Sequence, residues 1–227
     1  MSRCLIFCAG GFEGLLDAPR PGDRIIAADG GYAHVQKLGL RPDCVLGDFD
    51  SLGYVPQDSR VYPVKKDDTD AMLAVRRGLE LGCRQFLLYG SLDGPRLDHT
   101  VANFQLLQYL ADHGAVGWLI GNTHIVTLVH NGQLTFPADA TGYLSIFCFG
   151  ADAQGVTIRG AEYGLEQADL SAGFPLGVSN RFIGQPVEIC VEDGSLLVIY
   201  DRNNGLCTVT PGKNSQSPVT GSPNDAI

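Results

Sequence analysis

The sequence lacks any apolar run long enough to cross a membrane. A transmembrane helix needs roughly 20 consecutive apolar residues, and no segment approaches that length. The short apolar run near the N-terminus breaks at Gly10, Gly11 and Glu13, which is too early for the hydrophobic region of a signal peptide. We therefore interpret this run as a buried first strand, and we expect a cytoplasmic protein.

Cysteine pairs with the spacing of a metal site or a redox motif are also missing. None of the seven cysteines belongs to a C-x-x-C pair, and most lie within apolar runs. The five histidines are equally scattered. Buried reduced thiols are the better interpretation, and a histidine–cysteine metal site or a disulfide framework is not expected.

The sequence has no excess of basic residues. Its formal net charge is −9, which disfavours a nucleic-acid partner because phosphate backbones require a basic face. With 44% hydrophobic and 18% charged residues, its 227 residues have the composition of a folded protein of one large or two small domains. A small polyanion such as ATP remains a possible ligand if divalent metal and local cations offset the charge.

Residues 1–122 alternate short apolar runs with helical patterns. Helices are predicted at residues 32–38, at residues 99–113, and from an N-cap at Thr69 to a stop at Gly82. This alternation is typical of an α/β domain with a largely parallel sheet. The predicted strands are residues 4–9, 24–28, 44–46, 86–89 and 116–120.

The rhythm changes after Asn122. Short strand-like segments follow one another, separated by glycine, asparagine and aspartate turns and without long helical patterns. They predict an antiparallel β-sandwich domain over residues 123–209, followed by a disordered tail of residues 210–227. The predicted strands are residues 125–129, 142–149, 155–159, 187–191 and 196–200.

Acidic residues recur just after predicted strands of the first half, where α/β sheets place their ligands. Asp29 is followed by Gly30 and Gly31, which let the backbone approach a ligand closely. Asp48 and Asp50 follow the third strand, and in an extended segment residues two apart point to the same side. The pair can therefore hold one cation together.

Two further acidic segments precede predicted helices. Residues 65–70 contain Lys66, Thr69 and Asp70 at a helix start, where free backbone N–H groups favour phosphate. Residues 90–99 begin with Gly90 and form a loop leading into the next helix.

Each segment taken alone has a plainer explanation as a turn, a helix cap or an ordinary ion pair such as Arg96 with Asp98. Four such segments with interspersed lysines and an arginine are better explained by phosphate chemistry. Magnesium binds oxygen ligands and relies on one or two carboxylates together with substrate phosphates.

The ordered set of motifs resembles the thiamine pyrophosphokinase family. The matching segments are residues 28–31, 47–51, 66–70 and 90–99, and Gly164–Leu165, residues 177–180 and residues 191–199 resemble the second domain of that family. The resemblance implies an α/β ATP-binding domain followed by a thiamine-binding β-sandwich. It also implies a homodimer whose sites lie between subunits.

The resemblance assigns roles to single residues. It implies that Asp48, Asp50 and Asp70 hold Mg²⁺ and the phosphate chain. It also implies that Asp29, Thr69 and Asp98 line the same cleft and that Ser179 and Asn180 lie near thiamine. From their places in the motifs, Gly30, Gly31, Lys66 and Gly90 are expected to contact the nucleotide as well.

One position departs from the family pattern. Members commonly carry an aromatic residue two positions after the Gly-Leu pair, where it can stack on a thiamine ring. Here that position is Gln167, and Tyr163 and Phe174 are the candidates to replace the ring.

The hypothesis for the reaction is an in-line attack of the thiamine hydroxyl on the β-phosphorus of ATP, with AMP as the leaving group. Such reactions depend mainly on positioning and charge neutralisation. Arg96 is expected to neutralise phosphate charge, and either Asp70 or Asp98 is expected to accept the hydroxyl proton.

Two alternatives stay open at this stage. A phosphatase of the haloacid dehalogenase type also carries an Asp-x-Asp motif after a strand, although that motif normally ends the first strand and Asp48 follows earlier ones. A non-catalytic nucleotide-binding module would bind ATP without releasing AMP.

Overall fold

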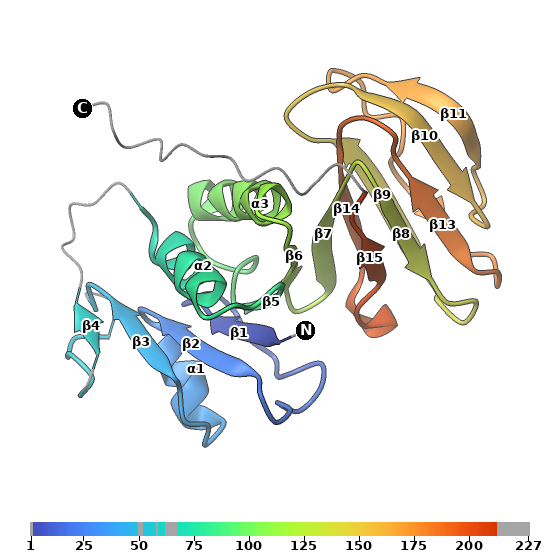
Figure 1. The fold of residues 1–227 in the computed structure, drawn as a ribbon. Coiled ribbons are helices and arrows are strands. Elements are labelled where there is room, and N and C mark those ends of the chain that lie inside the picture. The colour runs from blue at the N-terminus through green and yellow to red at the C-terminus, as the bar shows by residue number, and fades with distance from the viewer. Residues whose placement is uncertain (1, 50–51, 58, 62–67, 213–227) are drawn as a thin grey trace, which may run out of the picture.

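The computed structural model describes residues 2–49, 52–57, 59–61 and 68–212 (Figure 1). The strands and helices of the first half are β1 (Arg3–Phe7), β2 (Arg24–Ala28), α1 (Gly31–Lys37), β3 (Cys44–Gly47), β4 (Arg60–Val61), α2 (Asp70–Glu80), β5 (Gln85–Tyr89), α3 (Leu97–Asp112) and β6 (Val116–Ile120). They match the predicted helices and strands to within a few residues, apart from the two-residue strand β4.

The first half forms a parallel sheet in the order β4-β3-β2-β1-β5-β6. β1 lies in its centre and is buried along its whole length. This arrangement confirms the predicted α/β architecture. The predicted start of α2 is also confirmed, because the Thr69 hydroxyl accepts a hydrogen bond of 3.1 Å from the Met72 backbone N–H.

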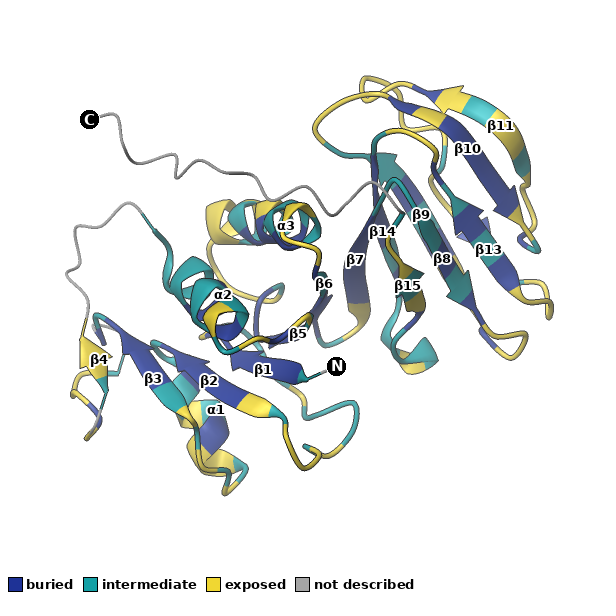
Figure 2. Ribbon diagram, in the orientation of Figure 1, coloured by how far each residue is buried: buried dark blue, intermediate teal, exposed yellow. Residues whose placement is uncertain are grey.

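Alternate residues of β1 face opposite sides of the sheet, as the two-residue period of a strand requires. Cys4 and Ile6 pack into a core beneath α2 and α3. Leu5 and Phe7 pack into a second core, which α1 covers and which continues into the second half of the chain. Figure 2 shows this burial along the central strands.

The second half is antiparallel, as predicted. Its strands are β7 (His124–His130), β8 (Gln133–Phe136), β9 (Tyr143–Cys148), β10 (Ala153–Arg159), β11 (Leu165–Leu170), β12 (Asn180–Arg181), β13 (Val187–Cys190), β14 (Ser195–Asp201) and β15 (Thr208–Thr210), with a short 3₁₀ helix η1 (Arg202–Asn204). β11, β10, β13, β8 and β15 form a five-stranded sheet.

The other four strands of this half extend the parallel sheet instead of forming a separate one. β7 pairs with β6 through contacts such as Ile120 opposite Ile125, and β14, β9 and β12 follow in the same ten-stranded sheet. The short turn after β6 makes this possible, because it folds the chain back into a hairpin. The division at residue 122 stays a prediction, and here it separates two parts that share one sheet.

Four strands of this half, β8, β11, β12 and β15, were not predicted. β15 includes Thr210, which is the first residue of the predicted disordered tail. Its sequence is polar and did not indicate a strand, but its hydrogen-bonded pairing with β8 holds it in place. Residues 213–227 lie outside the described part, so disorder there stays a prediction.

A buried ion-pair network holds the long segment between β1 and β2. Arg3 at the start of β1 donates hydrogen bonds to both carboxylate oxygens of Asp23, at 3.0 and 2.5 Å, and to Asp17 at 2.9 Å. The side chains of Arg3 and Asp23 are each only 6% exposed. Burial acts to raise the pKa of Asp23, but its hydrogen bonds with Arg3 and the Arg20 backbone hold that pKa below its usual range. The network fixes the path of this segment, which begins with the loop at Gly10.

Within the described residues, no helix combines the length and the apolar character that spanning a membrane requires.

Candidate active site

A cleft of about 640 Å³ opens at the carboxyl ends of the parallel strands. Its walls come from the residues that follow β1, β2, β3 and β5 and from the beginnings of α2 and α3. This is the edge at which open α/β sheets bind ligands. The acidic segments that the sequence places after successive strands therefore do meet at one edge.

Three carboxylates gather in this cleft. Asp29, Asp48 and Asp70 each present an oxygen, and these oxygens all lie within 4.8 Å of one another. Each side chain is partly buried. Like charges this close repel one another, and a divalent cation would relieve the repulsion. An all-oxygen ligand set of this kind suits a hard cation such as Mg²⁺.

Two members of the predicted metal set, Asp48 and Asp70, belong to this cluster, and Asp29, which was predicted to line the same cleft, is its third carboxylate among the described residues. β2 and β3 are neighbours, with Ala28 opposite Leu46, so Asp29 and Asp48 leave the sheet side by side. Asp50 lies outside the described residues, and so does Lys66.

The starts of two helices face the cleft. Thr69 and Asp70 at the beginning of α2 line it, and so does Arg96, the N-cap of α3, whose side chain makes no capping bond. The free N–H groups and the dipole at a helix N-terminus favour an anion. Asp68 also lines the cleft, but its carboxylate forms an ion pair of 2.9 Å with Arg76 of α2.

Arg96 and Asp98 form an exposed ion pair. The Arg96 guanidinium donates to both oxygens of Asp98, at 3.2 and 2.5 Å, and both side chains are nearly two-thirds exposed. The hydrogen bond from Arg96 holds the pKa of Asp98 below its usual range. Arg96 lines the cleft and Asp98 does not.

The predicted glycines pack the strand-end loops together. Gly90 lines the cleft with φ +65°, and a Cβ there would lie 2.5 Å from the Cys8 carbonyl oxygen. Gly30 and Gly31 do not line it. Gly30 caps α1, and Gly31 packs directly against the backbone of β1.

Sequence reasoning missed the loop after β1. Cys8, Ala9 and Gly10 line the cleft. The pattern that could have predicted this is the Gly10–Gly11 pair directly after a buried strand, which repeats the arrangement at Gly30–Gly31. Burial, together with the negative charge of Asp70, raises the pKa of the Cys8 thiol to about 12. The thiol is therefore protonated and unreactive at neutral pH.

Three polar side chains on the α3 side were missed as well. Ser91, Thr100 and Asn103 line the cleft. The sequence could have indicated two of them, because Thr100 and Asn103 are three positions apart and therefore lie on the same face of α3.

Ser179 and Asn180 lie at the edge strand β12 and do not line this cleft. Buried Asn180 binds both backbone groups of Tyr163, accepting from its N–H at 2.9 Å and donating to its carbonyl at 2.7 Å. The Tyr163 side chain is left 62% exposed. Gln167 has a left-handed backbone (φ +49°), and its N–H donates to the Thr157 hydroxyl. The assignment of these residues to thiamine stays a prediction.

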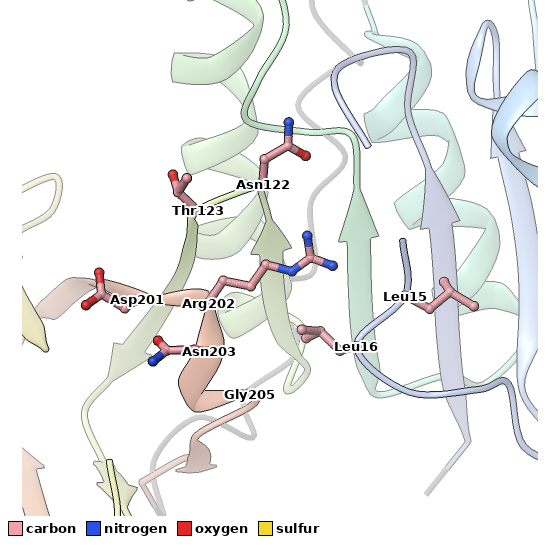
Figure 3. Close-up of a pocket in the computed structure, with 8 residues that line it drawn as sticks. All are labelled: Leu15, Leu16, Asn122, Thr123, Asp201, Arg202, Asn203 and Gly205. Atoms are coloured by element: carbon pink, nitrogen blue, oxygen red, sulfur yellow. The ribbon is translucent and has the colours of Figure 1, made fainter. Parts of the chain in front are cut away.

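A second hollow of about 630 Å³ lies between the segment after β1 and the end of β14. The Arg202 side chain extends into it, towards Leu15 and Leu16 (Figure 3). It shares no lining residue with the first cleft. Its one acidic lining residue, Asp201, forms a 3.8 Å pair with His124. The carboxylate cluster therefore makes the first cleft the candidate active site.

Comparison with known proteins assigns the family. The family model described as "Thiamin pyrophosphokinase, catalytic domain" matches residues 21–116, and the model described as "Thiamin pyrophosphokinase, vitamin B1 binding domain" matches residues 124–196. The chain belongs to the thiamin pyrophosphokinase family. The catalytic-domain match includes the cluster of Asp29, Asp48 and Asp70.

Individual relatives agree with this family. The thiamine pyrophosphokinase of Bacillus subtilis (strain 168) is 28% identical over 185 residues, covering 77% of this chain and 85% of the relative. The crystal structure of a Bacillus subtilis thiamine pyrophosphokinase covers 88% of this chain and 99% of its own, with a TM-score of 0.76 and 24% identity. The crystal structure of the thiamin pyrophosphokinase from Geobacillus thermodenitrificans has a TM-score of 0.73 and 27% identity. It covers 88% of this chain and 97% of its own. The predicted fold is thus confirmed, and these matches favour the pyrophosphokinase family over a dehalogenase-type phosphatase or a non-catalytic module.

Proposed function

We propose that the chain transfers a diphosphate from ATP to the hydroxyl of thiamine, giving thiamine diphosphate and AMP. The observation that carries this proposal is the position of the carboxylate cluster at the start of α2, within the segment matched by the catalytic-domain model. Such a site combines acidic metal ligands with helix N–H groups that bind phosphate.

Asp29, Asp48 and Asp70 would hold the metal, which we propose to be Mg²⁺. When bound, the ion would neutralise and polarise the diphosphate that is transferred. The start of α2 would bind phosphate oxygens through its backbone N–H groups, and Arg96 would bind them through the N–H groups that its pair with Asp98 does not use. Of the two candidates for accepting the hydroxyl proton, Asp70 lines the cleft and Asp98 does not, which supports Asp70.

The assay that tests this function uses the purified chain with ATP and Mg²⁺, with and without thiamine. We expect AMP and thiamine diphosphate to form in equal amounts, and only when thiamine is present. Release of inorganic phosphate without thiamine diphosphate would instead support a phosphatase. Binding of ATP without AMP formation would support a non-catalytic module.

We also propose a homodimer in which the second half of one subunit faces the cleft of the other. Apolar side chains around the thiamine candidate Ser179 are exposed, which supports a covering partner at this surface. They are Tyr163 (62% exposed), Phe174 (66%), Leu176 (54%), Val178 (43%) and Ile183 (49%).

Sedimentation equilibrium tests this assembly. We expect the mass of a dimer for the unmodified chain and a shift towards monomer for Phe174→Asp, because a buried unpaired charge would oppose association. The matched control is Tyr54→Asp, on an exposed loop of the first half. A monomer mass for the unmodified chain at micromolar concentration would contradict the proposal.

A further inference from the structure

One wall of the candidate active site consists of three polar side chains from neighbouring segments. Ser91 follows β5, while Thr100 and Asn103 belong to the first two turns of α3. Ser91 and Asn103 are only 4% and 7% exposed, and Thr100 is partly buried. Because these groups are held in place, the hydrogen-bonding capacity that each has left defines what the wall can recognise.

The two hydroxyl groups have already used their protons. Ser91 Oγ donates to the Leu88 carbonyl at 2.7 Å, and Thr100 Oγ1 donates to the Leu92 carbonyl at 3.2 Å. A hydroxyl has a single proton, so each group can only accept a further hydrogen bond.

The orientation of the Asn103 amide follows from its partner. One amide atom lies 2.7 Å from the Ser91 carbonyl oxygen, which can only accept, so this atom must be Nδ2. Among the described residues, none donates a hydrogen bond to Asn103 Oδ1. This oxygen is the acceptor that Asn103 offers to the cleft, and Nδ2 keeps one N–H.

We propose that Ser91, Thr100 and Asn103 form the subsite for an N–H or O–H group of the nucleotide, either a ribose hydroxyl or the amino group of adenine. The inference rests on the proposed function. Phosphate does not suit this wall, because its oxygens would face three acceptors and only one remaining donor, Asn103 Nδ2. Phosphate is better placed at the carboxylate-bound metal and the helix starts. The wall stands beside Gly90 and Arg96 in the segment matched by the catalytic-domain model, on the side where the phosphates are expected, so we assign the group to the nucleotide.

Nucleotide analogues test the subsite. Binding is measured by calorimetry with Mg²⁺ for ATP, 2′-deoxy-ATP, 3′-deoxy-ATP and purine riboside triphosphate, which lacks the amino group. Thr100→Val removes one acceptor at nearly constant volume, and Asn103→Leu removes another. For an amino group, which has two protons, each variant is expected to weaken ATP binding about 5- to 10-fold, the value of one net hydrogen bond. For a hydroxyl, which has one proton, only the variant that removes its acceptor is expected to do so.

The decisive result is the coupling between variant and analogue, that is, whether the loss of affinity from the substitution and the loss from the missing nucleotide group add together or not. The analogue that lacks the contacted group should bind the unmodified chain about 5- to 10-fold more weakly than ATP, with no further loss in the variant. Coupling to a deoxy analogue identifies a ribose hydroxyl, and coupling to the purine analogue identifies the amino group. The matched control is Thr123→Val, which alters an exposed threonine of the second hollow and should change none of these affinities.

Equal losses for ATP and all three analogues would overturn the subsite, because they would mean that the wall only supports the cleft. Thr100→Val keeps the test informative if Asn103→Leu unfolds. Binding also separates this inference from the proposed function. If the chain binds ATP but forms no AMP, the function fails and the coupling still decides the subsite.

Discussion

Replacing Asp48 by asparagine is expected to lower the magnesium-dependent formation of AMP by about 100- to 1,000-fold. The substitution keeps the size of the side chain and one oxygen, but it removes one of the three negative charges gathered within 4.8 Å. Weaker attraction for the cation should also raise the Mg²⁺ concentration needed for half-maximal rate. The measurement is the rate of AMP formation across a Mg²⁺ titration.

A matched control is available outside the site. Asp139 lies in an exposed turn between β8 and β9, so Asp139→Asn should leave both the rate and the Mg²⁺ dependence unchanged. Normal Mg²⁺-dependent AMP formation by Asp48→Asn would remove Asp48 from the proposed ligand set. A phosphorylated Asp48 trapped during turnover would instead support the dehalogenase-type phosphatase.

Replacing Gly31 by alanine is expected to destabilise the fold by about 3 kcal/mol. A Cβ at this first residue of α1 would lie 1.9 Å from the Phe7 carbonyl oxygen and 2.8 Å from the Cys8 backbone nitrogen. Both atoms belong to the backbone at the end of the central strand, so no side-chain rotation can relieve the overlap. α1 or β1 must therefore shift, together with the cleft loop that follows β1.

Urea unfolding measures the loss, which should appear as a lower midpoint at an unchanged slope. Gly173→Ala is the matched control, because a Cβ there would meet only the Ser171 hydroxyl at 3.8 Å in an exposed loop. Equal midpoints for the two variants would show that the close approach of α1 to β1 does not contribute to stability.

Local signals were sufficient for most of the first half. The limits of β2 are those predicted, because a buried parallel strand is a continuous apolar run bounded by polar residues. α2 begins at the predicted cap, because capping depends on residues three positions apart. The strands β8, β12 and β15 escaped prediction, because partners distant in the sequence provide their order. β11 pairs with the preceding strand β10, but its mostly exposed and polar sequence carries no apolar alternation.

The sequence by itself determined that acidic residues follow successive strands and begin a helix, and these motifs already indicated the family. Only the tertiary structure decided which of them meet. The strand order places β2 next to β3, so Asp29 joins Asp48 and Asp70, while Asp68 turns to Arg76. Spacing along a chain fixes the direction of neighbouring side chains, but the distance between carboxylates on different strands depends on how the sheet is ordered.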